Sequence, residues 1–175
     1  MSLLTPEEKQ VLLNGVTREA ARLELRDIYA LEDEEARFEE FRRLGRRGTD
    51  QARITGQWLA FVRSATAAGI RLRRARVVSE PVTDYIRFEH AGTYLNVQAG
   101  ESVRWLSRRN AMGIALPATD FWLLDRTMVL ANYYSGDGRI VDQELTRDPV
   151  ISASCTYWFE AVWAAAIPHD DYRLD

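Results

Sequence analysis

The chain is poor in the residue types that build disulfides and metal sites. Its 175 residues include one cysteine and two histidines, so no intramolecular disulfide can form. Structural zinc sites usually take four cysteine and histidine ligands, which this composition does not supply. We therefore expect no metal site and no cofactor.

Long apolar runs are also missing. No stretch has the roughly 20 consecutive apolar residues that a membrane-spanning helix needs. The first residues, Met1 to Leu4, lead directly into a capped helix rather than into the apolar region of a signal peptide. The expectations are a protein with no membrane association, a cytoplasmic location and a single domain over residues 1–175.

Lysine is nearly absent. Lys9 is the only lysine, and the other basic residues are arginines, in a chain whose formal net charge is −3. A bias toward GC-rich codons explains such a composition without any functional cause. The alternative is that some arginines bind phosphates or carboxylates in a bidentate manner, which lysine cannot do.

Common catalytic motifs are missing as well. The chain has no Gly-x-Ser-x-Gly elbow, no glycine-rich phosphate loop and no His-Glu-x-x-His. Cys155 falls on the apolar face of an expected helix, which disfavours a nucleophile role. Residues 135–138 (Ser-Gly-Asp-Gly) predict a hairpin turn, because calcium loops need further oxygen ligands at alternate positions. We expect no catalytic residues.

The first part of the chain, residues 1–69, is predicted to be mainly helical. Residues 5–8 (Thr-Pro-Glu-Glu) are a strong helix start, and Asn14-Gly15 ends that helix. A second helix is expected from Thr17, although Leu23 and Leu25 also fit a short strand. Helical spacing of apolar residues predicts two more helices, over 32–44 and 50–68.

The second part, residues 70–175, is predicted to be the sheet-containing core. Glu80-Pro81 should end the first strand, with Pro81 opening a helix that runs to His90 and Gly92 breaking the pattern. Asp148-Pro149 should start the final helix. The expected class is α/β or α+β, a central mixed sheet flanked by helices. Its strands are expected over 70–79, 102–106, 121–124, 127–134 and 139–146.

Three segments carry a resemblance to a known family. They are residues 76–89 (RVVSEPVTDYIRFE), 99–106 (AGESVRWL) and 120–125 (DFWLLD). In these segments the chain resembles an uncharacterised domain family common in actinobacteria. That resemblance implies no assigned function, and it implies helix-turn-helix regulators as genomic neighbours and candidate partners.

The last third of the chain also resembles a phospholipase D-like half-domain. The matching features are Asp125, Ala131-Asn132 and a helix with Phe159 and Trp163. Active members carry His-x-Lys before the aspartate, and these two positions are Ala118 and Asp120 here. The resemblance implies a catalytically inactive core, with Asp125 and Asn132 retained as scaffold. Since such half-domains often pair around one site, it also implies a homodimer.

A polar and aromatic cluster is the candidate ligand site. It begins where a buried strand meets a helix, the usual crevice of open α/β sheets. We expect a small anionic or planar ligand held by aromatic walls and arginine, although Asp84 and Arg87 also fit a structural pair on one helix face. The candidate residues are Glu80, Asp84, Tyr85, Arg87, Arg104, Trp105 and Trp122.

The main hypothesis is a non-catalytic regulatory module that binds a ligand or partner. One alternative is an enzyme of unknown class that uses Glu80, Asp84 and Tyr85. Another is a DNA-associated regulator, but the acidic net charge and the lack of a recognition motif disfavour nucleic acid. His90 is expected at a helix end, and His169 in a solvated tail. The arginines of the DNA hypothesis are Arg71, Arg73, Arg74 and Arg76, with Arg108 and Arg109.

Overall fold

A seven-stranded mixed sheet forms the centre of the protein, described here from a computed structural model that covers residues 3–30, 32–48 and 56–174. The strand order is β6-β5-β4-β1-β2-β3-β7. This arrangement confirms the expected mixed α/β class. The strands are β1 (Glu19–Glu24), β2 (Arg71–Val78), β3 (Ser102–Ser107), β4 (Asp120–Leu124), β5 (Met128–Tyr134), β6 (Ile140–Thr146) and β7 (Ile167–Pro168).

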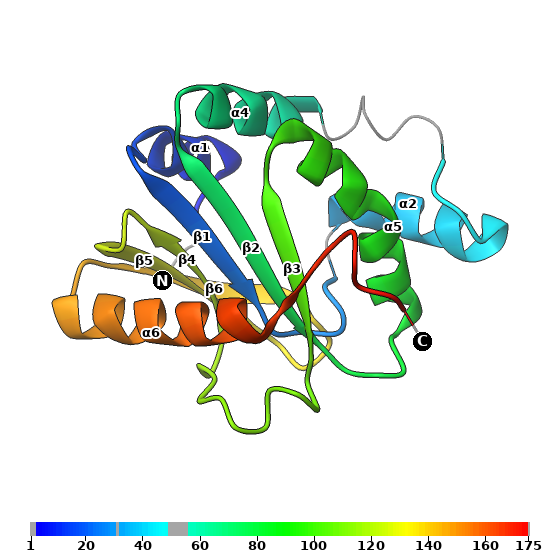
Figure 1. Ribbon diagram of the computed structural model, residues 1–175. Helices are drawn as coiled ribbons and strands as arrows, with labels where there is room; N and C mark the ends of the chain where they lie inside the picture. Colours follow the sequence, from blue (N-terminus) through cyan, green and yellow to red (C-terminus); the bar gives the residue numbers. More distant parts are fainter. Residues whose placement is uncertain (1–2, 31, 49–55, 175) are drawn as a thin grey trace.

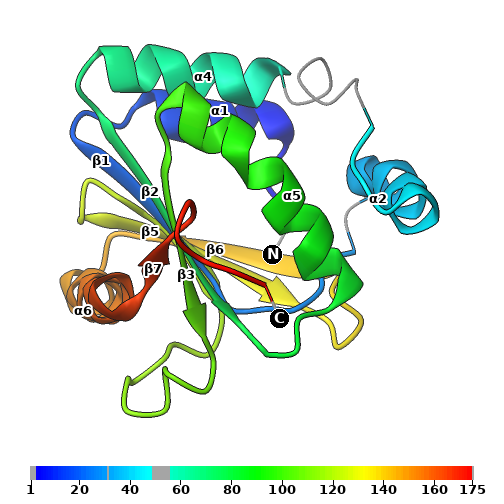
Figure 2. The same cartoon turned by 45° about the vertical axis from the view of Figure 1, so that its right-hand side comes forward.

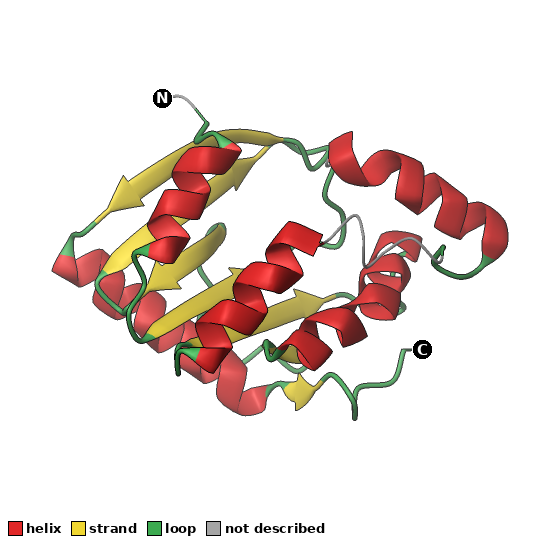
Figure 3. Ribbon diagram, turned by 90° about the horizontal axis from the view of Figure 1, so that it is seen from above, coloured by secondary structure: helices red, strands yellow, loops and turns green. Residues whose placement is uncertain are grey.

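Helices cover both faces of the sheet. In Figures 1 and 2, α1, α4 and α5 lie on one side of the sheet and α6 lies on the other. Viewed from above, the helices of the first side lie over the strands (Figure 3). The helices in the described residues are α1 (Pro6–Asn14), α2 (Glu32–Leu44), α4 (Gly56–Ala67), α5 (Asp84–Ala99) and α6 (Pro149–Ala165).

Strand β1 corrects the expectation of a helix from Thr17. It lies in the middle of the sheet, parallel to β2 and antiparallel to β4. Residues 1–69 are therefore not only helical, and they supply a central strand of the same sheet as residues 70–175. The strand that Leu23 and Leu25 allowed is the form adopted, because backbone pairing on both sides outweighs a weak helical pattern.

The α6 face of the sheet is apolar. Alternation along each strand sends Ala21 and Leu23 of β1 to this side, where they pack with Phe159 and Val162 of α6. Helix α6 begins as the sequence predicts, with Asp148 as N-cap accepting from the amide of Val150 at 2.7 Å. Cys155 is buried in this cluster, as its place on the apolar helix face predicted.

On the opposite face, the apolar clusters formed by the described residues lie towards its two ends. One contains Leu59 and Leu124 under α4, and the other contains Phe88 and Trp105 under α5. The strand positions between them carry charged side chains instead. Ion pairs join these groups: Arg22 and Glu24 from β1, and Arg74 and Arg76 from β2.

The start of α1 and the end of α4 also follow the sequence, whereas the start of α5 does not. Helix α1 has the predicted capping box, in which Thr5 and Glu8 each accept from the other's backbone amide. Helix α4 ends close to the predicted position, and its expected start lies outside the described residues. Helix α5 starts after Thr83 rather than at Pro81, because the Thr83 hydroxyl caps the amide of Ile86.

Gly92 does not break α5, which continues to Ala99 and ends at Gly100 in the left-handed conformation, φ 108°. The reason for glycine at position 92 is a side-chain contact. A Cβ at this position would overlap the guanidinium of Arg47, which lies against the helix. That guanidinium donates to the carbonyl of Phe88 at 2.7 Å. Gly92 therefore makes room for an arginine beside the helix.

The C-terminal segment is not the solvated tail that was expected around His169. Strand β7 pairs with β3, and His169 is 9% exposed. Its Nδ1 accepts from the indole of Trp105 at 3.1 Å. His90 was expected at a helix end but lies in the middle of α5, with its ring 4.5 Å from that of His169. The segment is fixed because β3 offers it backbone partners.

Candidate functional site

A cavity lies on the charged face of the sheet. Its volume is about 520 Å³, which is in the range of small-molecule sites. Strands β1, β2, β4, β5 and β6 contribute lining residues, and so do helices α1, α2, α4 and α5. Its cationic lining residues are Lys9, Arg22, Arg37, Arg47, Arg74 and Arg76, whereas its acidic ones are Glu34 and Glu89.

Glu24 is the centre of the charged network below this cavity. Its carboxylate lies 2.9 Å from Arg22, 3.1 Å from Arg74 and 2.6 Å from Arg76. Its side chain is only 5% exposed. Burial acts to raise the pKa of Glu24, but the three guanidinium groups outweigh it and hold the pKa at about 2. Glu24 is therefore a charged structural anchor.

Two more carboxylates complete the network. Glu89 of α5 binds Arg76 at 2.5 Å and Arg47 at 3.2 Å. Burial acts to raise the pKa of Glu89, but Arg76 and Arg47 keep it below its usual value. Glu101, just before β3, binds Arg74 at 2.8 Å and accepts from Asn96 at 2.6 Å. Four arginines thus share three carboxylates.

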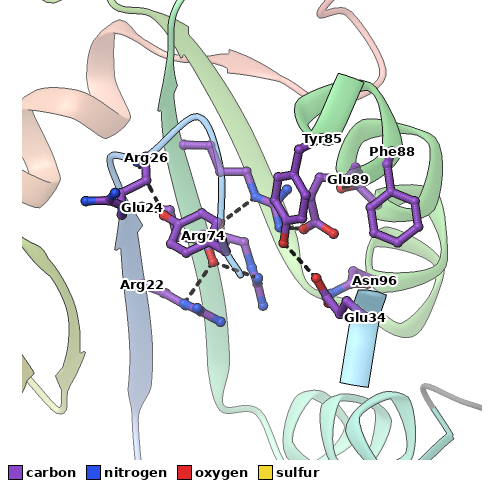
Figure 4. Close-up of polar contacts among 12 residues, drawn as sticks. Arg22, Glu24, Arg26, Glu34, Arg74, Tyr85, Phe88, Glu89 and Asn96 are labelled. Carbon is purple, nitrogen blue, oxygen red and sulfur yellow. Dashed lines mark hydrogen bonds and ion pairs between the residues drawn. The ribbon is translucent and has the colours of Figure 1, made fainter. Parts of the chain in front are cut away.

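Figure 4 shows how separate elements bring these groups together. Arg22 and Glu24 project from β1 and Arg74 from β2, towards the side where Tyr85 and Glu89 project from α5. The hydroxyl of Tyr85 donates to Glu34 of α2 at 2.6 Å. Burial, followed by the nearby carboxylates, raises the pKa of Tyr85. Tyr85 is therefore a neutral donor that joins α5 to α2.

The α1 end of the cavity combines aromatic rings with two cations, Lys9 and Arg22, of which Arg22 is paired with Glu24. The guanidinium of Arg22 lies 5.1 Å from the ring centre of Trp122, and Trp122 contacts Trp58 with ring centres 5.9 Å apart. Lys9 of α1 lines the same end. Burial, and then Arg22, lower the pKa of Lys9. Among the described residues, no carboxylate forms an ion pair with Lys9.

This arrangement favours binding over acid–base chemistry. Glu24 and Glu89 are ionised and held by arginines, so neither is poised to exchange a proton near neutral pH. No described group of three His, Cys, Asp or Glu side chains is placed to hold a metal ion. The cations outnumber the acids around the cavity, which suits a negatively charged ligand.

The structure does not bring the seven candidate residues of the sequence together. Trp122 lines the large cavity, and Tyr85 reaches Glu34 on its wall. Glu80 instead accepts from Tyr172 at 2.6 Å, and it lines a separate cleft with Arg108 and Arg109. That hydrogen bond is the main reason why the pKa of Glu80 is lowered.

The other four candidates lie elsewhere. Asp84 is exposed at the start of α5, and Arg87 lines a second cleft beside His90. Arg104 points to the α6 face, where it donates to the carbonyl of Trp163 at 2.9 Å. Trp105 is fully buried beneath the C-terminal segment, with Tyr172 stacked on it. Neighbours in the sequence are separated here because adjacent strand residues face opposite sides of the sheet.

The arginine run of β2 is divided between the two faces of the sheet. Arg73 faces α6, where it pairs with Glu19 at 2.7 Å and with Glu160 at 2.7 Å. Arg74 and Arg76 belong to the Glu24 network on the other side. Only Arg71 of this strand keeps a mainly exposed side chain, at 66%. The run therefore does not form the basic surface that the DNA hypothesis requires.

The charged residues of the Glu24 network were not among the ligand-site candidates from the sequence, but they follow a recognisable pattern. Arg22 and Glu24 alternate with Ala21 and Leu23, and Arg74 and Arg76 alternate in the same way with Ala75 and Val77. A charge at every second position of a buried strand marks a polar face. The parallel register then pairs Arg22 with Arg74 and Glu24 with Arg76.

Comparison with known proteins places the chain in one family. The family model described as a domain of unknown function (DUF6879) matches residues 7–174, so the chain belongs to this family. This confirms the resemblance to an uncharacterised domain family that the sequence motifs indicated. No curated protein matches the chain. None of the described helices is long and apolar enough to cross a membrane.

Proposed function

We propose that this protein is a non-catalytic binding module that takes a small anionic molecule into the cavity on the sheet face. The observation that carries the proposal is the cation-rich lining of a 520 Å³ cavity, in which four arginines share three carboxylates and Lys9 adds a further charge. Arginines already held by carboxylates are preorganised, so an anion binds with little loss of side-chain entropy.

A degenerate phospholipase D-like core is part of this proposal. The strands and helix after Asp120 follow the order that the resemblance implies. Asp120 occupies the position of the lysine in active members, and a carboxyl group supplies no cation for a phosphate. It is buried and accepts a hydrogen bond from Tyr29 at 2.5 Å. Asp125 accepts from the backbone amides of Thr17, Arg18 and Glu19, which supports a scaffold role. Phosphodiester turnover abolished by one substitution would contradict the proposal.

The enzyme alternative receives less support. It needs Glu80, Asp84 and Tyr85 to act on one substrate. Glu80 is engaged by Tyr172, Tyr85 is engaged by Glu34, and Asp84 is exposed at the helix start. With these side chains directed to different partners, binding remains the function that the geometry favours.

Blocking the cavity tests the proposal. Gln57 is exposed on α4 and lines the cavity, so Gln57→Trp should fill the entrance without disturbing the core. We expect small carboxylates and phosphate esters to raise the melting temperature of the wild-type protein, and neutral analogues to have little effect. The Gln57→Trp variant should lose that rise, as measured by differential scanning fluorimetry across one compound panel.

The matched control is Gln98→Trp. Gln98 is exposed on α5 and is not among the residues that line this cavity. The control should keep every ligand-induced shift. A panel in which no anion stabilises the wild-type protein, or in which Gln57→Trp retains all shifts, would overturn the proposal.

The regulatory part of the proposal concerns partners: a second copy of the chain and a helix-turn-helix regulator. Strand β6 is an edge of the sheet, and its Val141 and Leu145 are 56% and 45% exposed. Such an edge can pair with the same strand of a second copy. We expect light scattering to give a dimer mass for the chain alone, and a larger complex when a helix-turn-helix regulator is added. A monomer in both samples would contradict these partners.

A further inference from the structure

The α1 end of the cavity has an unusual group of hydrogen-bond donors. Lys9 makes no ion pair with any carboxylate among the described residues, although it is half-buried beside Arg22. The indole Nε1 of Trp58, on α4, is buried and finds no acceptor. A buried donor without an acceptor is rare in proteins and often marks the place of an absent water or ligand oxygen.

Apolar surface lies directly beside these donors. Leu12 and Leu13 of α1 and Leu130 of β5 line the cavity there, together with the rings of Trp58 and Trp122. Arg74 lies 5.8 Å from the ring centre of Trp58, and Arg22 lies 5.1 Å from that of Trp122. One end of the cavity therefore offers donors for an oxyanion and a wall for a planar or apolar body.

We infer that the ligand of this cavity is an aromatic oxyanion, a small carboxylate or phosphate ester, whose charged group binds Lys9 and Arg22 and whose ring lies against Trp58 and Trp122. This inference rests on the proposed function and adds the chemical class. The oxyanion would accept from the Lys9 ammonium and from the Trp58 indole, both of which have no acceptor in the described structure. A charged hydrogen bond of this kind is among the stronger polar contacts in proteins.

Four probes separate the parts of the inference: benzoate, phenyl phosphate, benzamide and inorganic phosphate. Benzoate and benzamide share a ring and differ in charge, whereas inorganic phosphate has the charge without a ring. We expect benzoate and phenyl phosphate to bind, and both benzamide and inorganic phosphate to bind at least about tenfold more weakly, as measured by titration calorimetry. The tighter of the first two identifies the head group.

Two substitutions locate the binding site of the head group. Lys9→Met removes the ammonium and keeps the length of the side chain, and should weaken benzoate and phenyl phosphate about tenfold. Trp58→Phe keeps an aromatic ring and removes the indole donor, and should weaken both probes several-fold. The control is Arg63→Met, which removes an exposed cation from α4 outside the cavity lining and should leave binding unchanged.

The outcomes distinguish this inference from the broader proposal. Benzamide binding as tightly as benzoate, or equal affinities in Lys9→Met and Arg63→Met, would overturn the inference. If another anion still binds and Gln57→Trp still blocks it, the proposed function stands without the aromatic oxyanion. Failure of benzoate and phenyl phosphate to bind the wild-type protein also overturns the inference, and the cavity-blocking panel then decides the proposed function separately.

Discussion

Replacing Glu24 with glutamine is expected to lower the free energy of unfolding by about 3–5 kcal/mol at neutral pH. Glutamine keeps the shape of the side chain but removes the charge that three guanidinium groups share. Arg74 and Arg76 have side chains only 8% and 7% exposed, so water cannot replace the lost carboxylate. The measurement is chemical denaturation of both proteins with linear extrapolation to zero denaturant.

Two controls set the scale for Glu24→Gln. Asp137→Asn removes one partner of the exposed pair with Arg139 and should leave the free energy of unfolding nearly unchanged, because water screens that pair. Glu101→Gln should have an intermediate effect, because Arg74 keeps its contact with Glu24. A Glu24→Gln effect as small as that of Asp137→Asn would contradict the description of Glu24 as the anchor of the network.

The pH dependence of this effect has a defined sign. The folded pKa of Glu24, about 2, is below the ordinary value of 4.5. Its contribution is therefore complete above about pH 4.5 and is lost as the pH falls toward 2. The difference between the wild-type protein and Glu24→Gln should shrink over that interval, because the wild-type carboxylate becomes protonated.

The second large effect concerns His169. Burial, and then the neighbouring His90, lower the pKa of His169 to about 4 from an ordinary 6.5. The unfolded chain therefore binds this proton first as the pH falls, so the contribution of neutral His169 is complete above pH 6.5 and declines toward pH 4. This difference between the folded and unfolded pKa of His169 contributes at most about 3 kcal/mol to the free energy of unfolding.

The surroundings of His169 explain this shift. His90 faces it from α5, Trp105 donates to its Nδ1 from β3, and the charge of Arg76 comes from β2. Within the C-terminal segment, Asp170 opposes the shift and Arg173 adds to it. Tyr172 fixes the segment by donating to Glu80. Protonation of His169 thus places a charge among cations and rings.

His169→Asn is the substitution that tests this effect, since the asparagine oxygen can still accept from Trp105. The stability gap between the wild-type protein and His169→Asn should narrow by up to about 3 kcal/mol between pH 6.5 and pH 4, as measured by urea denaturation at each pH. A gap that stays constant over this range would contradict the assignment of a buried neutral histidine.

The comparison must be made between variants because Asp120 acts in the opposite direction. Burial raises the pKa of Asp120 to about 6 from 3.8, despite the hydrogen bond from Tyr29. The folded chain therefore keeps a proton that the unfolded chain loses, so this contribution falls as the pH rises from 3.8 to 6. In the wild-type protein the two effects partly cancel, whereas the His169→Asn difference isolates one of them.

The sequence predicts the local features of this fold well. The capping box of Thr5 and Glu8 and the N-cap of Asp148 involve residues only a few positions apart, so local chemistry decides them. The continuation of α5 through Gly92 was not predictable in this way. It depends on Arg47, which comes from another part of the chain and lies against α5.

The candidate site was less predictable because its parts are distant in the sequence. Arg22 and Arg74 become neighbours only when β1 and β2 pair in parallel with one register. A shift of one residue would place Arg22 and Arg74 on opposite faces of the sheet. The sequence shows the alternating charges, but it does not show which charges share a carboxylate.

The sequence by itself determined the mixed α/β class, the helix caps at Thr5 and Asp148, the burial of Cys155 and the lack of common catalytic motifs. Each of these follows from composition or from residues close together in the chain. Tertiary structure decided that β1 is a central strand, that Glu24 joins three arginines and that Lys9, Trp58 and Trp122 line one cavity. The physical reason is that strand pairing and helix packing, rather than local propensity, set which buried charges meet.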